Sequence, residues 1–162
     1  MSSVECLFCD EHVQGNNTFL ENDLFRARWD QIPVSPGHAE VVPKRHIQYF
    51  DELSDEEKEN LLKFASEAIA IIKRSDLLAS EYERLLETAN DYVRPHLQAA
   101  FERARIITSS PDAFNHGLND GAEAGQTIPH LHYHVIPRWN GDVENPRGGV
   151  RRIFGEDDYS NG

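Results

Sequence analysis

The most regular pattern of apolar and polar positions in this chain is helical, and it begins after Ser54. Ser54 and Glu57 have the spacing of a capping box, in which each side chain accepts a hydrogen bond from the other residue's backbone N–H at a helix start. Apolar residues then recur at intervals of three and four, the period of one helix face. They are Leu61, Leu62, Ala65, Ala68, Ile69 and Ile72. We predict a helix from about Asp55 to Arg74.

A second helical pattern follows and contains a proline. Its apolar positions are Tyr82, Leu85, Leu86, Ala89 and Val93 before the proline, and Leu97, Ala100, Phe101 and Ala104 after it. Pro95 lacks a backbone N–H and its ring clashes with the preceding turn of a helix, so we expect a helix to end or bend there.

Shorter segments between turn-forming residues predict β-strands on both sides of the helical region. The predicted strands are residues 18–28 (two short strands joined at Glu21-Asn22-Asp23), 38–43, 114–119 and 128–137. Glycine and proline mark the turns, as in the stretch 30–37 with Pro33 and Pro36. This mixture predicts an α+β fold in which an antiparallel sheet carries its helices on one side.

Length and charge limit the classes of function. The chain has 162 residues, of which 39% are hydrophobic, and this suits one domain with its own core. Its net charge of -12 argues against nucleic acid as a partner, because nucleic-acid binding relies on clustered lysine and arginine. No apolar run is long enough to span a membrane, and the polar start of the chain does not resemble a signal peptide. We therefore expect a cytoplasmic protein that contacts no membrane.

The strongest chemical signal is formed by His130, His132 and His134. In a β-strand these alternate positions share one face, and the apolar residues between them share the other. Three imidazoles in register indicate chemistry more often than a polar core. A metal site is an alternative, since His-x-His directs two ring nitrogens at one ion. The all-β barrels that usually carry such sites are not favoured by the predicted helices.

The stretch before these histidines, Asn119 to Thr127, is rich in glycine. Glycine lets a backbone approach an anion closely, and Gln126 and Thr127 add side-chain donors. A phosphate bound to this loop would lie near the histidine face. The alternative is a plain glycine-rich turn, and the glycines alone do not decide between the two.

Both cysteines of the chain, Cys6 and Cys9, lie near its start. Cysteines this close together rarely cross-link a secreted fold, and in a cytoplasmic chain they indicate metal ligands or a redox pair. The redox pair is less favoured, because no thioredoxin-like strand-to-helix context follows Cys9.

Together these segments resemble the histidine triad family of nucleotide hydrolases and transferases. The motifs are Cys6-Leu7-Phe8-Cys9, Pro36-Gly37-His38-Ala39-Glu40-Val41-Val42-Pro43-Lys44-Arg45-His46, Asn119-Asp120-Gly121, Ala124-Gly125-Gln126-Thr127 and His130-Leu131-His132-Tyr133-His134-Val135-Ile136-Pro137-Arg138. They occur in the family's order and span most of the chain, and the cysteine motif is similar to that of bacterial, zinc-bearing members.

The resemblance implies a covalent mechanism at the α-phosphate of a nucleotide. The family's middle histidine is the nucleophile, and this role falls on His132; imidazole titrates at about pH 6.5, so it is largely neutral at neutral pH. The other implied catalytic residues are His134, which contacts the α-phosphate, and His38, which supports the hydrogen-bond network. The implied nucleotide-binding residues are Asp30 (for ribose), Asn119, Gly125, Gln126, Thr127 and His134. Asp30 equally suits a turn.

A structural zinc site is also implied, with Cys6, Cys9, His46 and His130 as ligands. Two thiolates and two imidazoles suit a closed tetrahedral site. His130 would then bind metal rather than take part in catalysis. No organic cofactor is expected.

The chain departs from the family at residues 76–110, which are longer than the usual connection. We interpret this stretch as a helical insertion in a single domain over residues 1–162, with a C-terminal arm over about 140–162. The resemblance also implies a homodimer.

The favoured activity is hydrolysis of a dinucleoside polyphosphate, such as a diadenosine compound. A dinucleoside polyphosphate phosphorylase and a nucleoside phosphoramidate hydrolase would both use His132, so the triad does not separate these alternatives. The remaining alternative is a nucleotide-binding scaffold with little catalysis, which the intact triad disfavours.

Overall fold

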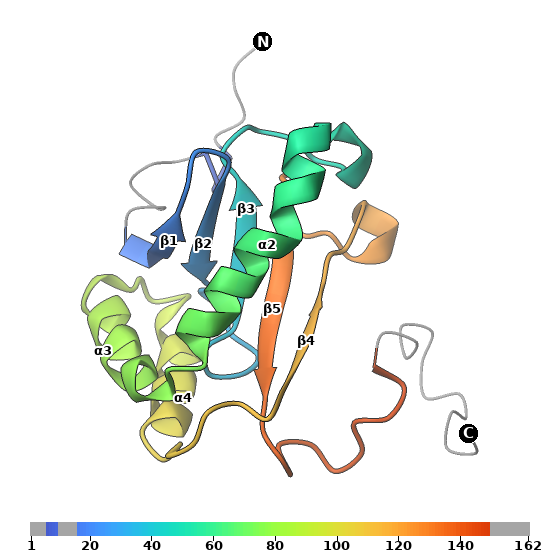
Figure 1. Cartoon of the computed structure of the whole chain (residues 1–162). Helices are drawn as coiled ribbons and strands as arrows, with labels where there is room; N and C mark the ends of the chain where they lie inside the picture. Colours follow the sequence, from blue (N-terminus) through green and yellow to red (C-terminus); the bar gives the residue numbers. More distant parts are fainter. Residues whose placement is uncertain (1–5, 10–15, 150–162) are drawn as a thin grey trace.

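Five antiparallel strands form the sheet of this fold (Figure 1). The computed structural model describes residues 6–9 and 16–149. The strands are β1 (Thr18–Glu21), β2 (Phe25–Trp29), β3 (Ala39–Pro43), β4 (Ala113–Gly117) and β5 (Tyr133–Arg138), in the spatial order β1-β2-β3-β5-β4. Because β5 lies between β3 and β4, segments from both halves of the chain meet in the middle of the sheet. The α+β prediction is confirmed.

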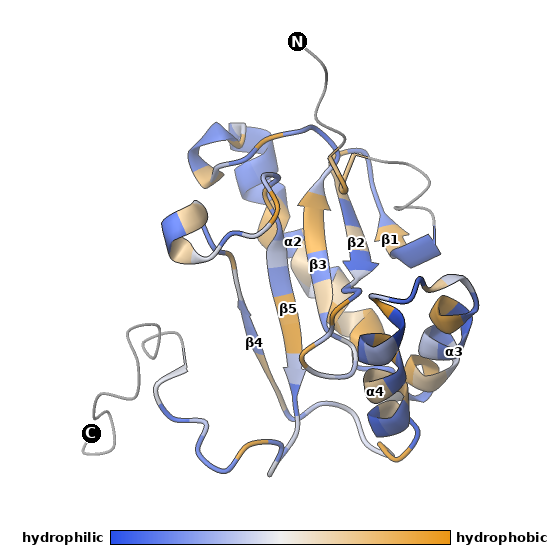
Figure 2. Ribbon diagram, turned by 180° about the vertical axis from the view of Figure 1, so that it is seen from behind, coloured by the Kyte–Doolittle hydropathy of each residue, from blue (hydrophilic) through white to orange (hydrophobic). Residues whose placement is uncertain are grey.

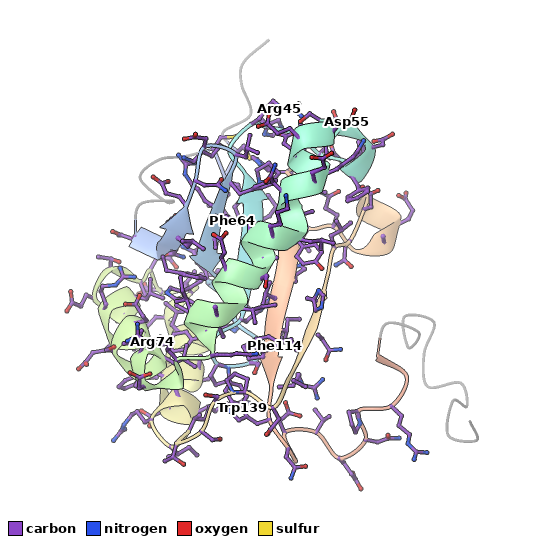
Figure 3. All side chains as sticks on the ribbon, viewed as in Figure 1. Arg45, Asp55, Phe64, Arg74, Phe114 and Trp139 are labelled. Carbon is purple, nitrogen blue, oxygen red and sulfur yellow. The ribbon has the colours of Figure 1, made fainter. Side chains whose placement is uncertain are left out.

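Helix α2 (Asp55–Ile72) crosses one face of the sheet (Figure 1). Its start confirms the predicted capping box: the Glu57 N–H donates to Ser54 Oγ at 3.1 Å, and the Ser54 N–H donates to Glu57 Oε2 at 2.7 Å. Phe64 points from the helix towards the sheet (Figure 3) and is buried. Leu62 was wrongly assigned to the same stripe: it is 61% exposed, because each helical residue turns by about 100° from the last.

The predicted helical stretch forms helices α3 (Leu78–Thr88) and α4 (Arg94–Ala104). Pro95 lies in the first turn of α4, where its missing N–H removes no bond within the helix. The Arg94 guanidinium donates to two carbonyls near the end of α3, at 3.0 and 2.6 Å. The proline therefore starts a new helix after a short connection. The 3-10 turns are η1 (Phe50–Glu52), η2 (Ser75–Leu77) and η3 (Ala122–Ala124).

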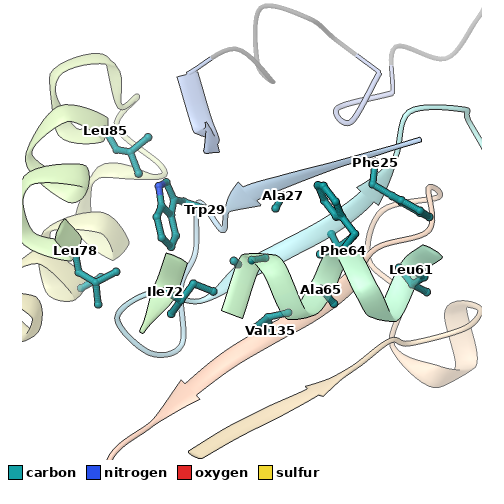
Figure 4. Packing of buried hydrophobic residues seen from close by; sticks show 14 of the residues in the cluster. Phe25, Ala27, Trp29, Leu61, Phe64, Ala65, Ile72, Leu78, Leu85 and Val135 are labelled. Carbon is teal, nitrogen blue, oxygen red and sulfur yellow. The ribbon is translucent and has the colours of Figure 1, made fainter. Parts of the chain in front are cut away.

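The core lies between α2, one face of the sheet and the α3–α4 pair (Figure 4). The buried strand residues of this cluster are Phe25, Ala27, Trp29, Ala39, Val41 and Val135. Two hydrogen bonds join α3 to the loop and strand beside it: the Gly37 N–H donates to Tyr82 Oη at 2.7 Å, and Trp29 Nε1 donates to Glu81 at 3.0 Å. These bonds fix the loop that leads into β3.

The opposite face of the sheet, seen from behind in Figure 2, is not covered by α2. Side chains alternate along strands, so the residues between the core positions project from this face. Arg28 of β2 lies opposite Glu40 of β3, and Glu40 lies opposite His134 of β5. We call these three residues the polar row.

The strand that carries the histidines is shorter than predicted. β5 begins after His132, so only His134 of the three histidines lies in a regular strand. The ladder between β3 and β5 stops at the pair Val41 and Tyr133, although β3 itself continues to Pro43. Instead, the Leu131 N–H donates to the Ile47 carbonyl at 2.7 Å. The prediction of one regular strand through all three histidines is therefore wrong.

The predicted C-terminal arm is described in part. Residues 140–149 consist mostly of turns and bends, and residues 150–162 lie outside the described part. Within the described ranges, no helix is both long enough and apolar enough to cross a bilayer.

Candidate active site

Three histidines converge on the face of the sheet that carries the polar row. His38 precedes β3, His132 precedes β5 and His134 lies in β5. His38 Nε2 and His134 Nδ1 are 3.0 Å apart, and the rings of His132 and His134 lie nearly perpendicular, with centroids 4.9 Å apart. The structure therefore brings together the residues that we predicted as catalytic.

The His132 ring is held by the backbone. Its Nδ1 lies 2.8 Å from the carbonyl oxygen of His130, so Nδ1–H donates and Nε2 keeps its lone pair. Burial is the main cause that lowers the pKa of His132, and it also lowers the pKa of His134, to about 4, with further contributions from His38 and His132. Both rings are neutral at neutral pH, the state that a nitrogen nucleophile needs.

Asp30 connects the histidines to the loop after β2. One carboxylate oxygen accepts from the Ile32 N–H at 2.7 Å, which is an Asx turn, and the other lies 3.1 Å from His38 Nδ1. The turn-forming interpretation of Asp30 is correct. The same carboxylate also belongs to the site, where it orients the His38 ring.

The glycine-rich loop is shaped by its own side chains. Gln126 Oε1 accepts from the Gly121 N–H at 3.0 Å, and Gln126 Nε2 donates to the Gln48 carbonyl at 3.0 Å. Asn119 Nδ2 makes a long contact of 3.5 Å with the carbonyl of Gly125, whose φ of 89° favours glycine. The Gln126 amide thus orders the loop in this structure, while Thr127, just before the histidine segment, is exposed.

Four predicted metal ligands also converge. Sγ of Cys6 is 3.4 Å from His130 Nδ1, and Sγ of Cys9 is 3.3 Å from His46 Nδ1 and 3.5 Å from His130 Nδ1. Tetrahedral zinc bonds of about 2.3 Å to sulfur and about 2.0 Å to nitrogen would put these atoms roughly 3.5 Å apart. His130 Nε2 donates to the Pro43 carbonyl at 2.9 Å, which leaves Nδ1 free as a ligand atom. The donor set therefore fits a zinc ion.

Three site residues were missed by the sequence interpretation. Arg28 and Glu40 lie buried beside the histidines, and their side chains approach to 3.8 Å. Phe8 lies between the two cysteines, makes edge contacts with His132 at 5.3 Å between ring centroids, and packs 4.7 Å from the Arg28 guanidinium carbon. The signal for the charged pair was its spacing: Arg28 is two positions before Asp30, and Glu40 is two positions after His38, so alternation puts them on the site face.

Known proteins are similar to this chain in sequence. An AP-4-A phosphorylase of Mycobacterium tuberculosis is 33% identical over 112 residues, which are 68% of this chain and 40% of that protein. A bis(5'-nucleosyl)-tetraphosphatase [asymmetrical] of Schizosaccharomyces pombe is 28% identical over 136 residues, which are 84% of this chain and 57% of that protein. The chain thus spans about half the length of these two relatives.

A solved structure supports the likeness at the level of the fold. The crystal structure of a HIT family protein from Bacillus anthracis superposes with a TM-score of 0.57 at 25% identity, and the match covers 86% of this chain and 77% of that chain. The sequence model of the family described as the HIT domain matches residues 11–141, which include all three clustered histidines. The chain therefore belongs to the HIT domain family.

Proposed function

We propose that this protein is a hydrolase or transferase that cleaves a dinucleoside polyphosphate or a related nucleotide conjugate at its α-phosphate, with His132 as the nucleophile. The observation that carries the proposal is the 2.8 Å contact between His132 Nδ1 and the His130 carbonyl oxygen. This contact keeps the proton on Nδ1 and leaves a lone pair on Nε2, beside His134.

In the first step, the His132 Nε2 lone pair forms a bond to the α-phosphorus, and the bond from that phosphorus to the bridging oxygen breaks. The bridging oxygen leaves with the electron pair as an anionic phosphate oxygen of the departing group. In the second step, a water oxygen attacks the phosphorus and gives a proton to the neutral, hydrogen-bonded pair of His38 and His134, which then releases it to solvent. The phosphorus–nitrogen bond breaks, and a nucleoside monophosphate leaves.

The remaining predicted residues bind the substrate in this proposal. His134 contacts the α-phosphate, and the loop that includes Asn119, Gly125, Gln126 and Thr127 offers backbone and side-chain donors to phosphate oxygens. Asp30 has the carboxylate chemistry to accept hydrogen bonds from ribose hydroxyls. Its contact with His38 would then couple ribose binding to the orientation of the catalytic histidines.

The names of the relatives support a dinucleoside polyphosphate as the substrate. One relative is named for phosphorolysis and another for hydrolysis, and the two reactions differ only in whether phosphate or water attacks the second time. Hydrolysis of a nucleoside phosphoramidate is the alternative that would use the same His132.

Three further features belong to the proposal. A structural zinc ion would be held by Cys6, Cys9, His46 and His130, and when bound it would supply a rigid link between chain segments rather than take part in the chemistry. The homodimer and the cytoplasmic location stay predictions of the sequence, as does the interpretation of residues 76–110 as an insertion.

The proposal is tested with diadenosine tetraphosphate, diadenosine triphosphate and an adenosine phosphoramidate, each with and without added phosphate. The His132→Asn variant should lose activity by several orders of magnitude, and short acid-free quenching of the wild type should trap a nucleotidylated protein. The exposed His96 on α4 gives a matched control, and His96→Asn should retain full turnover. Unchanged turnover in His132→Asn would remove the nucleophile assignment.

A further inference from the structure

The charged pair Arg28 and Glu40 lacks hydrogen-bond partners for part of its polar atoms within the described part of the protein. Arg28 is 1% exposed, and neither its Nε nor its Nη1 has a hydrogen-bond partner. The closest approach to the Glu40 carboxylate, from Nη1, is 3.8 Å, which is too long for a hydrogen bond. Unpaired donors on a buried guanidinium are costly and rare, and apolar residues often stabilise a protein as well as a buried ion pair does. The unmet donors indicate a missing ligand.

The position of the pair connects that ligand to the catalytic histidines. A carboxylate oxygen of Glu40 and one ring nitrogen each of His132 and His134 all lie within 4.8 Å of one another. Arg28 lies one strand further away, opposite Glu40. A substrate attached to His132 therefore has Glu40 as an immediate neighbour and Arg28 as the next group across the sheet.

The direction of the substrate follows from the proposed function, on which this inference rests. The glycine-rich loop connects β4 to β5, and in the proposed function it holds the polyphosphate on that side of the sheet. Asp30, at the end of β2, is on the other side of the histidines. A nucleotide whose α-phosphorus lies at His132 thus extends its nucleoside over β3 and β2, where Glu40 and Arg28 face it.

Phe8 completes this subsite. It contacts both Arg28 and His132, and His132 itself is only 3% exposed. Phe8 therefore borders both the proposed nucleophile and the charged pair. An aromatic ring beside a hydrogen-bonding pair is a typical setting for a planar base, which stacks on the ring and presents its edge to the polar groups.

We propose that Phe8, Arg28 and Glu40 form the nucleobase subsite and that the charged pair selects guanine. Guanine carries a carbonyl oxygen, O6, next to two donors, N1–H and the N2 amino group. The Arg28 guanidinium donates to O6, and Glu40, which the base binds as a carboxylate, accepts from the two donors with its two oxygens. Adenine offers the pair one acceptor and one amino group, so one carboxylate oxygen stays unpaired. Uracil and cytosine place a carbonyl oxygen against the carboxylate.

A phosphate group fits the subsite less well than a base. The Glu40 carboxylate lies between Arg28 and the histidines and would repel an anion at that distance. A ligand that satisfies both members of the pair needs adjacent donors and acceptors, which a phosphate lacks.

The test measures base preference in binding and in turnover. Calorimetry with GMP and AMP gives their affinities for the wild-type protein, and kinetics gives kcat/KM for diguanosine and diadenosine tetraphosphate. We expect guanine to be preferred at least about tenfold in both measurements, the size of effect that a bidentate base contact produces.

Variants of Arg28 and Glu40 test whether this pair causes the preference for guanine. The double variant Arg28→Leu/Glu40→Leu replaces the pair by apolar residues of similar size, a change that buried ion pairs usually tolerate, and should bring the guanine-to-adenine ratio close to one. Glu40→Gln, which keeps the shape of the side chain, should lower the ratio in part. Arg105→Leu, which removes an exposed ion pair with Glu102 on α4, should leave the ratio unchanged.

The outcomes separate this inference from the proposed function. Turnover with equal use of guanine and adenine overturns the base assignment alone, as does a preference that survives the double variant. Guanine-selective binding without any turnover overturns the proposed catalysis and keeps the base assignment. Failure to bind either nucleotide overturns both.

Discussion

The charge of Glu40 depends strongly on its surroundings. Burial raises the pKa of its carboxyl group to about 8, Asp30 adds to the rise, and Arg28 opposes it. His132 and His134 are the other titratable groups that face it. The folded state thus favours the neutral acid relative to its usual pKa of 4.5. The stability that this preference contributes is present below the usual pKa and is lost as the pH rises towards 8.

The variant Glu40→Gln should therefore gain stability over the wild type as the pH rises. At about pH 5 the wild-type side chain is neutral in the folded protein, whereas at about pH 9 it must be buried as a carboxylate. The difference in melting temperature, variant minus wild type, should become more positive between these two values. Glu102→Gln, at an exposed ion pair, is the control and should show no such trend. A difference that stays constant with pH would contradict the raised pKa.

Gly37 is a second residue whose identity the structure explains. Its φ is 79°, and a Cβ added there would lie 3.2 Å from side-chain atoms of Ile72, Leu78 and Pro137. We predict that Gly37→Ala lowers the free energy of unfolding by roughly 1–3 kcal/mol, through backbone strain and crowding. Urea unfolding measures the change. Gly117→Ala is the control, because a Cβ at Gly117 meets no atom within 4 Å; equal losses in both variants would refute the crowding argument.

At the scale of elements, the sequence predicted the ends of helices and strands most reliably where a local hydrogen bond determines the end. The capping box placed the start of α2 at Asp55, as observed, whereas the end was expected at Arg74 and lies at Ile72. The start of β5 was missed because it depends on where the pairing with β3 stops, at Val41, which is information from another part of the chain. Pro95 was correctly predicted to mark a helix boundary. The sequence interpretation did not predict that it lies in the first turn of the second helix rather than at the end of the first.

The cap of α2 carries a measurable share of stability. We predict that Ser54→Ala lowers the free energy of unfolding by about 1 kcal/mol, because the Glu57 N–H loses its hydrogen-bond acceptor. The side chain of Glu57 keeps its ion pair with Arg45 at 2.7 Å in this variant. Chemical denaturation measures this loss. Ser66→Ala, at an exposed position inside the same helix, should be neutral or slightly stabilising. A similar loss in both serine variants would show that the effect is not due to capping.

At the scale of the whole molecule, the candidate site combines segments that the sequence could only suggest to be neighbours. The histidine and cysteine motifs were found because the family repeats them in a fixed order. Phe8 and Glu40 lie within those motifs but were given no role there, and Arg28 lies outside them; the meeting of the three depends on strand register and on the path of the chain around the cysteines. Alternation gives the face on which a strand residue lies, but not the residue opposite it.

The cluster of Cys6, Cys9, His46 and His130 connects distant segments of the chain to the proposed nucleophile. It joins the turn of Cys6 and Cys9 to His46, which follows β3, and to His130, which precedes β5. The carbonyl of His130 holds His132 Nδ1, so the position of the metal ligand also sets the position of the nucleophilic ring. A bound metal should therefore influence both stability and catalysis, although it lies outside the reaction.

In the proposed zinc-bound protein, removal of the metal by a chelator should lower the melting temperature and kcat together, with a smaller change in KM. At this chain length each kcal/mol of lost stability corresponds to about 2–4 °C. Thermal unfolding, steady-state kinetics and metal analysis are measured before chelation, after it and after zinc is added back, which should restore both properties. The Cys6→Ser/Cys9→Ser variant should start at the lowered values and respond to neither chelator nor zinc. If the metal is lost and both properties stay unchanged, the cluster does not position His132, and the backbone bond of that ring is maintained by the Leu131 and Pro43 contacts alone.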